Sequence, residues 1–169
     1  MPSPTSRTPH VLFVCQKNGG KSQMAAALLR DLAGDGVVVT SAGTLPGTVL
    51  NAQSVESLAE IGVGVGDEHP KALTPEMLEA ADVVVVLGTE AQVQAPDGTP
   101  LETWVTDEPS DRGITGAERM RLVRDDIRAR VTALLVELSG SYDALLAEPE
   151  SAISADDLRA RLAARHDAR

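Results

Sequence analysis

The segment from Cys15 to Ser22 reads Cys-Gln-Lys-Asn-Gly-Gly-Lys-Ser and brings together a thiol, two glycines, a lysine and a hydroxyl. Because glycine tolerates positive φ, Gly19 and Gly20 are expected to let successive backbone N–H groups curl inward around an anion. A thiolate is itself an anion, so a cysteine in such a cradle loses its proton more readily than an ordinary thiol. The segment therefore predicts a nucleophile and a site for a tetrahedral oxyanion in a single turn of chain.

The elements on either side of this segment are expected to hold it at a ligand-binding edge. Residues 10–14, His-Val-Leu-Phe-Val, are typical of a buried strand, and residues 23–33 are strong helix formers that end at Gly34. In a parallel α/β sheet, ligands bind at the carboxyl ends of the strands, and the next helix directs its free N–H groups toward the loop. The segment is not a Walker loop, because a cysteine leads it and the glycine-to-lysine spacing differs.

Strand-like and helix-like runs alternate along the rest of the chain, which predicts right-handed βαβ units and a parallel sheet. The valine run near residue 85 has no polar interruption, as expected of a strand covered on both faces. Thr74 and Pro75 have the pattern of a helix start. We expect further strands at 36–41, 82–87 and 101–105, and helices at 51–61 and 115–138.

Length and charge limit the classes of function. The chain has 169 residues, enough for one ordinary domain, and its net charge of −10 argues against a nucleic-acid binder and against docking on an anionic membrane. No apolar run approaches the ~20 residues that span a bilayer. Residues 1–9 are polar and proline-rich, without the apolar core of a signal peptide, so we expect a disordered arm and a cytoplasmic protein.

Cysteine and histidine usage limits the chemistry further. Cys15 is the one cysteine of the sequence, which excludes an internal disulfide and a cysteine-cluster metal site, and the three histidines are scattered, so no metal is expected. The alternative interpretation makes Cys15 a small buried hydrophobe at the end of a strand. The glycine pair, the Lys-Ser and the immediate helix start favour the functional interpretation.

The loop resembles the phosphate-binding loop of the low-molecular-weight protein tyrosine phosphatases, and more closely that of the arsenate reductases that share their fold. Ser-Ala-Gly-Thr at 41–44, Asp107 and Pro109 after the fourth strand, and the long final helix agree with the same family. The resemblance covers residues 10–138 and implies a three-layer α/β fold, with a four-stranded parallel sheet of order 2-1-3-4 between helices. Residues 139–169 then form a helical or flexible C-terminal extension.

The resemblance implies roles for individual residues. Cys15 is the nucleophile, and Asp107 is the general acid that protonates the departing oxygen. Asn18 holds the loop in its strained shape, and the Ser22 hydroxyl donates to the thiolate. The residues expected to bind the oxyanion are Gln16, Lys17, Asn18, Gly19, Gly20, Lys21 and Ser22.

Two departures from the family pattern matter. The phosphatase loop ends in Arg-Ser, whereas Lys21 stands at the arginine position, and a lysine is a point charge that cannot grip two oxygens in a fork. This disfavours hydrolysis of phosphate esters. Glu108 separates Asp107 from Pro109, so Glu108 and Asp111 remain alternatives for the acid.

One thiol also limits the redox chemistry. Reduction of arsenic(V) to arsenic(III) needs two electrons, which one cysteine cannot supply by forming an internal disulfide. The run 18–26, Asn-Gly-Gly-Lys-Ser-Gln-Met-Ala-Ala, resembles the actinobacterial arsenate–mycothiol transferases. That resemblance implies arsenate detoxification with mycothiol as co-substrate, no bound cofactor and a mycoredoxin-type partner that releases arsenite.

Two other functions stay open at this point. One is a low-molecular-weight phosphatase acting on phosphotyrosine, and the other is a non-catalytic sensor that binds an oxyanion. The charged segment 140–169 leaves room for a homodimer in any of these cases.

Overall fold

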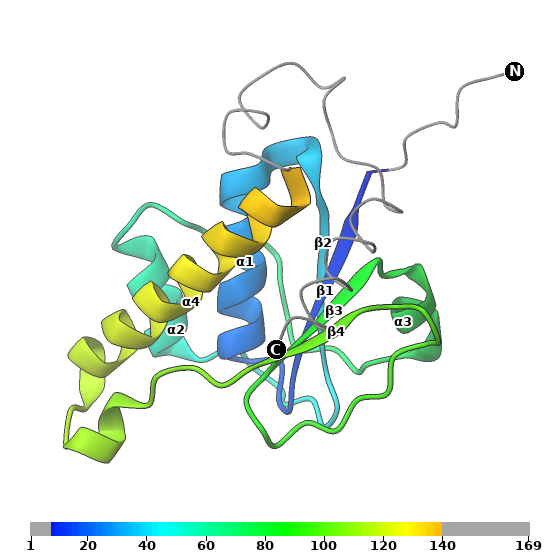
Figure 1. Cartoon of the computed structure of the whole chain (residues 1–169). Coiled ribbons are helices and arrows are strands. Elements are labelled where there is room, and N and C mark those ends of the chain that lie inside the picture. Colours follow the sequence, from blue (N-terminus) through cyan, green and yellow to red (C-terminus); the bar gives the residue numbers. More distant parts are fainter. Residues whose placement is uncertain (1–7, 140–169) are drawn as a thin grey trace, which may run out of the picture.

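A computed structural model describes residues 8–139, which form four parallel strands with helices on both sides (Figure 1). The sheet order is β2-β1-β3-β4, which confirms the order expected from the family resemblance. The predicted arm, apart from residues 8 and 9, and the predicted extension, apart from residue 139, lie outside the described residues. The strands are β1 (His10–Cys15), β2 (Val38–Gly43), β3 (Val83–Leu87) and β4 (Leu101–Trp104).

The helices form the two outer layers. Helices α1 (Lys21–Ala33), α2 (Ala52–Ala59) and α4 (Gly116–Ser139) cover one face of the sheet, whereas α3 (Pro75–Ala80) lies on the other (Figure 1). Two short 3-10 turns, Gly34–Gly36 and Pro109–Arg112, follow α1 and precede α4. Thr74 caps α3 as expected, because its hydroxyl accepts from the backbone N–H of Met77 at 3.2 Å.

Two predicted boundaries near the chemistry were wrong by two residues. Helix α1 was expected at residue 23 but begins at Lys21, so Lys21 and Ser22 belong to its first turn. Strand β2 was expected at 36–41 but runs over Val38–Gly43, because residues 34–36 form a 3-10 turn first. Both shifts bring residues of the loop motifs into regular structure.

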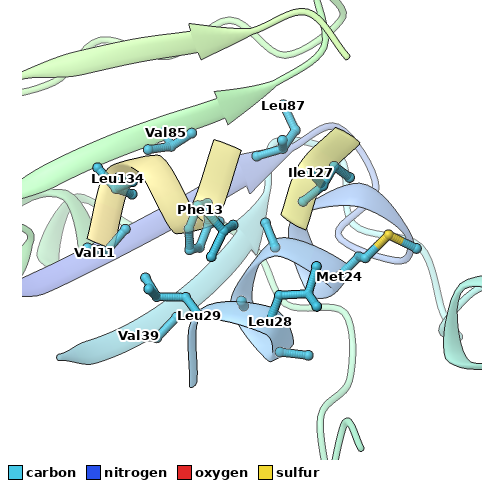
Figure 2. Close-up of a cluster of buried hydrophobic side chains, with 14 of the residues drawn as sticks. Val11, Phe13, Met24, Leu28, Leu29, Val39, Val85, Leu87, Ile127 and Leu134 are labelled. Carbon is cyan, nitrogen blue, oxygen red and sulfur yellow. The ribbon is translucent and has the colours of Figure 1, made fainter. Parts of the chain in front are cut away.

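Side chains of β1 alternate between two apolar clusters. Val11 and Phe13 pack toward α1 and α4, together with Leu28 and Ile127 (Figure 2), whereas Leu12 packs on the opposite face. This two-sided burial explains why the sequences of the two inner strands, β1 and β3, are almost continuously apolar. By the same alternation, Cys15 belongs to the cluster on the α1 side.

Two structural features bear on membranes and metals. Within residues 8–139, every helix is too short or too polar to cross a bilayer. The same part of the chain brings no three histidine, cysteine, aspartate or glutamate side chains together as a set that could hold a metal ion.

Candidate anion-binding and thiol site

Cys15 is the last residue of β1, and residues 16–20 connect it directly to α1. The thiol therefore lies at the carboxyl edge of the parallel sheet, where ligands bind in this class of fold. β1 is an inner strand, paired with β2 and β3, so the loop leaves the middle of the sheet. The loop contains all the residues that the sequence assigns to anion binding except Lys21 and Ser22, which start the helix.

The segment 44–51 holds the carbonyl groups of the loop on one side. Its amides donate to loop carbonyl oxygens in four hydrogen bonds: Thr44 to Cys15 at 3.2 Å, Leu45 to Gln16 at 2.8 Å, Gly47 to Lys17 at 2.9 Å and Asn51 to Gly19 at 2.7 Å. A trans peptide unit directs its N–H opposite to its C=O, so the N–H groups of residues 16, 17, 18 and 20 face the other way. The result is a row of donors on the side of the thiol.

The first turn of α1 adds donors to this row. The amides of Lys21, Ser22 and Gln23 precede the first helical hydrogen bond, from Met24 N to Gly20 O at 2.9 Å. The first turn also carries no acidic side chain that would occupy the positive end of the helix dipole. No acceptor within residues 8–139 pairs with the N–H groups of residues 19–22. Such a helix start favours an anion.

Asn18 organises the loop through every polar atom of its side chain. The residue is fully buried and has φ of 51°, the left-handed conformation. Its amide nitrogen Nδ2 donates to Ser22 Oγ at 2.9 Å and to Ser41 Oγ at 3.0 Å, and its Oδ1 accepts from the backbone N–H of Lys71 at 3.0 Å. These bonds stabilise a conformation that residues other than glycine adopt uncommonly.

The expected positive φ at Gly19 and Gly20 was wrong, because the left-handed residue of the loop is Asn18. Gly20 has φ of −127°. Gly19 is favoured for a different reason, since a Cβ there would lie 3.1 Å from the carbonyl oxygen of Val49, a contact tight enough that one of the two would have to shift slightly. Asparagine adopts the left-handed conformation more often than most other non-glycine residues do. Here the hydrogen bonds of its side chain stabilise the turn that the glycines were expected to provide.

The sulfur of Cys15 receives two hydrogen-bond donors. The backbone N–H of Asn18 points at Sγ from 3.2 Å, and Ser22 Oγ lies 2.9 Å from Sγ. A thiolate has no hydrogen to donate, so with Cys15 ionised Ser22 Oγ, which accepts from Asn18 Nδ2, donates its hydroxyl hydrogen to the sulfur. Both donors stabilise a negative sulfur, and 9% of Cys15 is exposed.

The two lysines of the loop differ in their surroundings. Lys21 is half-buried and its ammonium nitrogen lies 3.8 Å from Glu108 Oε2. Lys17 is exposed and makes no ion pair with any other residue between 8 and 139. Lys21 is therefore the lysine whose ammonium group is held in place by an ion pair at the start of α1. Gln16 and Lys17 contribute their backbone amides to the row of donors.

The structure separates the three acids that the sequence left open. Arg112 donates hydrogen bonds to both carboxylate oxygens of Asp107, at 2.7 and 2.9 Å, and this hydrogen bonding lowers the pKa of Asp107. Asp111 is exposed. Glu108 is the acid that faces the loop, because it contacts Lys21. The assignment of Asp107 as the general acid stays a prediction.

Glu108 itself is held by several donors. Ser110 Oγ donates to Glu108 Oε1 at 2.7 Å, and Arg119 Nε donates to the same oxygen at 2.8 Å. The hydrogen bond from Ser110 lowers the pKa of Glu108, and Arg119 and Lys21 add to this effect against the opposing effect of burial. The Glu108 carboxylate is thus charged at neutral pH and shared between helix α4 and the loop lysine.

Sequence reasoning missed two residues that shape the loop. A Cβ on Gly43 would lie 2.7 Å from Gln16 O and 3.0 Å from Asn18 N, so only glycine lets β2 approach the loop so closely. The signal was present in the Ser-Ala-Gly-Thr motif. Gln23, which is 3% exposed, donates to Asn18, and its sequence signal was only its place in the run 18–26.

Comparison with known proteins agrees with this geometry. Residues 10–143 match the family described as low molecular weight phosphotyrosine protein phosphatase. The chain belongs to this family. Within the low-molecular-weight phosphatase family, the putative arsenate reductase of Halobacterium salinarum is 30% identical over 133 residues, which cover 75% of this chain and 91% of that protein. The arsenate reductase of Halalkalibacterium halodurans is 32% identical over 127 residues, 72% of this chain and 91% of that protein.

Solved structures of the family show the same fold. The thioredoxin-dependent arsenate reductase of Corynebacterium glutamicum superposes with a TM-score of 0.67 and 33% identity, over 78% of this chain and 62% of that one. An arsenate reductase in a phosphate-binding state gives a TM-score of 0.67 with 25% identity, over 78% of this chain and 99% of that one. A tyrosine phosphatase of Erwinia amylovora, 16% identical, shares the fold.

Proposed function

We propose that this protein is an arsenate reductase in which the loop after β1 binds arsenate and Cys15 attacks it. The observation that carries the proposal is the sulfur of Cys15, which meets Asn18 N–H at 3.2 Å and Ser22 Oγ at 2.9 Å beside a helix start with free amides. Relatives at 30% and 32% identity named arsenate reductases support arsenate as the anion. The same tetrahedral site accepts phosphate as a mimic.

The first step forms a sulfur–arsenic bond. The thiolate of Cys15 attacks the arsenic of HAsO4²⁻, one As–O bond breaks, and the departing oxygen leaves as water after it takes up one proton. Arsenic remains As(V) in the enzyme adduct. The row of backbone amides and Lys21 stabilise the charge on the arsenate oxygens, and no electron transfer is needed at this stage.

The proton for that step comes from an acid beside the loop. We keep Asp107 as the proposed donor and Glu108, which contacts Lys21, as its alternative. The pKa of each carboxyl lies below its ordinary value, through the hydrogen bond from Arg112 at Asp107 and through that from Ser110 at Glu108. Either acid is therefore charged in the free protein and must take up a proton from solvent before donating it to the departing oxygen.

The second step requires a thiol from outside the chain, because the sequence has one cysteine. The sulfur of mycothiol displaces Cys15 from arsenic, which returns the thiolate of Cys15 and releases an As(V)–mycothiol adduct. A thiol of a mycoredoxin-type partner then attacks the sulfur of this adduct. A mixed disulfide forms, the electron pair of the S–As bond stays on arsenic, and As(III) leaves as arsenite.

The test is reconstitution of the reaction with the full chain. We expect arsenite to appear only when arsenate, mycothiol and mycoredoxin are present together, and Cys15→Ser to abolish it. Replacing mycothiol and mycoredoxin by thioredoxin and its reductase examines the route that the name of the Corynebacterium relative indicates. Arsenite formation with thioredoxin alone would replace the mycothiol part of the proposal and leave the arsenate part in place.

The two remaining functions predict different results in the same assays. A phosphotyrosine phosphatase hydrolyses an aryl phosphate briskly, which Lys21 disfavours because it lacks the fork of arginine. A sensor binds phosphate or arsenate without turnover under any thiol condition. Brisk aryl phosphate hydrolysis, or binding with no arsenite formed, would each overturn the proposal.

A further inference from the structure

Gln23 is a buried amide in the first turn of α1 that the proposed chemistry does not use. Its side-chain nitrogen Nε2 lies 3.2 Å from Asn18 O, 3.2 Å from Asn18 Oδ1 and 3.3 Å from the carbonyl oxygen of His69. Three acceptors therefore surround one NH2 group. Within residues 8–139, the side chain of Gln23 makes no hydrogen bond to the sulfur of Cys15 or to the hydroxyl of Ser22.

The orientation of this amide follows from its surroundings. With the amide reversed, Gln23 Oε1 would face three oxygens, so the nitrogen must occupy this position. Gln23 Oε1 then has no hydrogen-bond partner within residues 8–139. A buried oxygen without a partner costs stability, and a methionine or leucine of similar size would avoid that cost. Glutamine at this position is explained by what its NH2 group holds.

The NH2 group holds the residue that controls both donors to the sulfur. Asn18 directs its own backbone N–H at Cys15 Sγ, and its Nδ2 orients the hydroxyl of Ser22. Both depend on the left-handed backbone of Asn18, with φ of 51°. Gln23 binds the backbone oxygen and the side-chain oxygen of Asn18, so it restrains the peptide and the side chain together.

Gln23 also connects Asn18 to the segment 68–71. His69 O accepts from Gln23, and the backbone N–H of Lys71 donates to Asn18 Oδ1 at 3.0 Å. Within that segment, Glu68 forms an ion pair with Lys71 at 2.7 Å. Glu68 also binds Arg30 at 3.0 Å, and this ion pair connects the segment to α1. The amide of Gln23 is thus the point where α1, the loop and the segment 68–71 meet.

We propose that Gln23 is a positioning residue that keeps Asn18, and through it the thiolate of Cys15, in the reactive arrangement. Its side chain acts through Asn18 and is not among the groups proposed to bind the arsenate. The inference rests on the proposed role of Cys15 as the nucleophile but not on the identity of the thiol co-substrate. Its consequence is a thiol whose reactivity depends on an amide that lies on the far side of Asn18.

The test measures the rate of alkylation of Cys15 by iodoacetamide between pH 5 and 9 in the full chain. We expect Gln23→Met to slow alkylation at pH 7 roughly fivefold to tenfold, as for the weakening of one hydrogen bond to a charged group, and to move the profile to higher pH. Gln23→Glu, which places an oxygen against three oxygens, is expected to slow it further. The control is Ser57→Ala, which removes a buried hydroxyl bonded to Ser54 O at 2.9 Å on α2.

Distinct outcomes separate this proposal from the proposed function. Folded Gln23→Met with a wild-type alkylation profile, or Ser57→Ala with the same slowing, would overturn the positioning role. Should Gln23→Met fail to fold, Gln23→Asn, which keeps the amide but is one methylene short, takes the same measurement with the same expectation. Failure of arsenate to protect wild-type Cys15 from alkylation would instead overturn arsenate binding, whatever the variants show.

Discussion

Glu108 Oε2 lies 3.8 Å from the ammonium nitrogen of Lys21, the lysine that replaces the arginine of the family loop. The carboxylate of Glu108 also forms an ion pair with Arg119 at 2.8 Å, and this contact holds it beside the loop. A negative group therefore lies beside the lysine that we propose stabilises an incoming oxyanion. Asp107, although adjacent in sequence, directs its carboxylate to Arg112.

Removal of the charge on Glu108 is expected to tighten anion binding. Glu108→Gln keeps the size of the side chain and removes a like charge near the bound anion, so we expect the affinity for inorganic phosphate to rise about twofold to fivefold at low salt. The measurement is protection of Cys15 against alkylation by increasing phosphate. The gain should shrink at high ionic strength.

Asp107→Asn is the matched control for Glu108→Gln. Because Asp107 is paired with Arg112, we expect its neutralisation to leave phosphate affinity within about twofold of wild type. Arsenite formation should fall at least about tenfold in Asp107→Asn if it is the proton donor. A tenfold fall in Glu108→Gln, with Asp107→Asn unaffected, would transfer that role to Glu108.

The two loop lysines should contribute unequally to anion binding. Lys21 is 30% exposed and begins α1, whereas Lys17 faces solvent. We expect Lys21→Ala to weaken phosphate protection of Cys15 at least about tenfold, as for loss of a charge-assisted contact, and Lys17→Ala less than about twofold. Equal and negligible effects would mean that the anion does not bind at the start of α1.

The sequence predicted the architecture because the signals that specify it are local. Alternating apolar runs and helix formers placed the four strands and the flanking helices, while the sheet order came from the family resemblance. Boundaries failed where a local turn competed with the pattern, as at Gly34–Gly36, which delays β2. The start of α1 was missed because the two glycines before Lys21 disfavour a helix and Ser22 after it favours one only weakly.

Within the site, the sequence identified the chemistry but not its geometry. Cys15, Asn18 and Ser22 were expected to interact, and they do. The left-handed residue was misassigned to the glycines because the side-chain bonds that stabilise Asn18 come partly from Lys71, which is 53 residues away. Glu108 and Lys21 lie far apart in the sequence, so no local pattern predicts their contact.

Loss of the Ser22 hydroxyl should lower the reactivity of the thiol. Ser22→Ala removes one of two donors to the sulfur of Cys15, at 2.9 Å, and we expect alkylation at pH 7 to slow roughly fivefold. Ser41→Ala is the matched control, because Ser41 Oγ accepts from Asn18 but does not contact the sulfur. A smaller effect is expected there. Greater slowing in Ser41→Ala than in Ser22→Ala would contradict the direct hydrogen bond.

Glu68 should make the free energy of unfolding depend on pH. Burial raises the pKa of Glu68, but the hydrogen bond and charge of Lys71, with Arg30, outweigh burial and lower it below the ordinary value of 4.5. A lowered folded-state pKa contributes stability above about pH 4.5 that is lost as pH falls through the folded value. Because the carboxylate is partly exposed, the contribution at pH 7 is at most about 1 kcal/mol.

Urea denaturation of wild type and Glu68→Gln at several pH values measures this contribution. We expect wild type to be more stable at pH 7 and the difference to shrink as the pH falls below about 4.5, where the unfolded chain takes up the proton first and the folded protein only at lower pH. Added salt should reduce the difference at pH 7. A difference that grows as the pH falls would have the wrong sign for a carboxylate stabilised by Lys71.

Gly43 tests whether the approach of β2 to the loop controls the thiol. A Cβ at this position would lie 2.7 Å from Gln16 O, a backbone atom that itself accepts from Leu45, so relief requires the loop to move. We expect Gly43→Ala to lower the free energy of unfolding by about 1–3 kcal/mol, as for an overpacked core site. Displacement of the Gln16 peptide should also slow alkylation of Cys15.

Gly36→Ala is the control, because no heavy atom beyond its chain neighbours lies within 4 Å of a Cβ built there. It should change the free energy of unfolding by less than about 1 kcal/mol and leave alkylation unchanged. The pair separates the general cost of replacing a glycine from the contact with Gln16. If both variants behaved alike in stability and in thiol reactivity, the close contact at Gly43 would have no part in shaping the loop, and the glycine of the Ser-Ala-Gly-Thr motif would need another explanation.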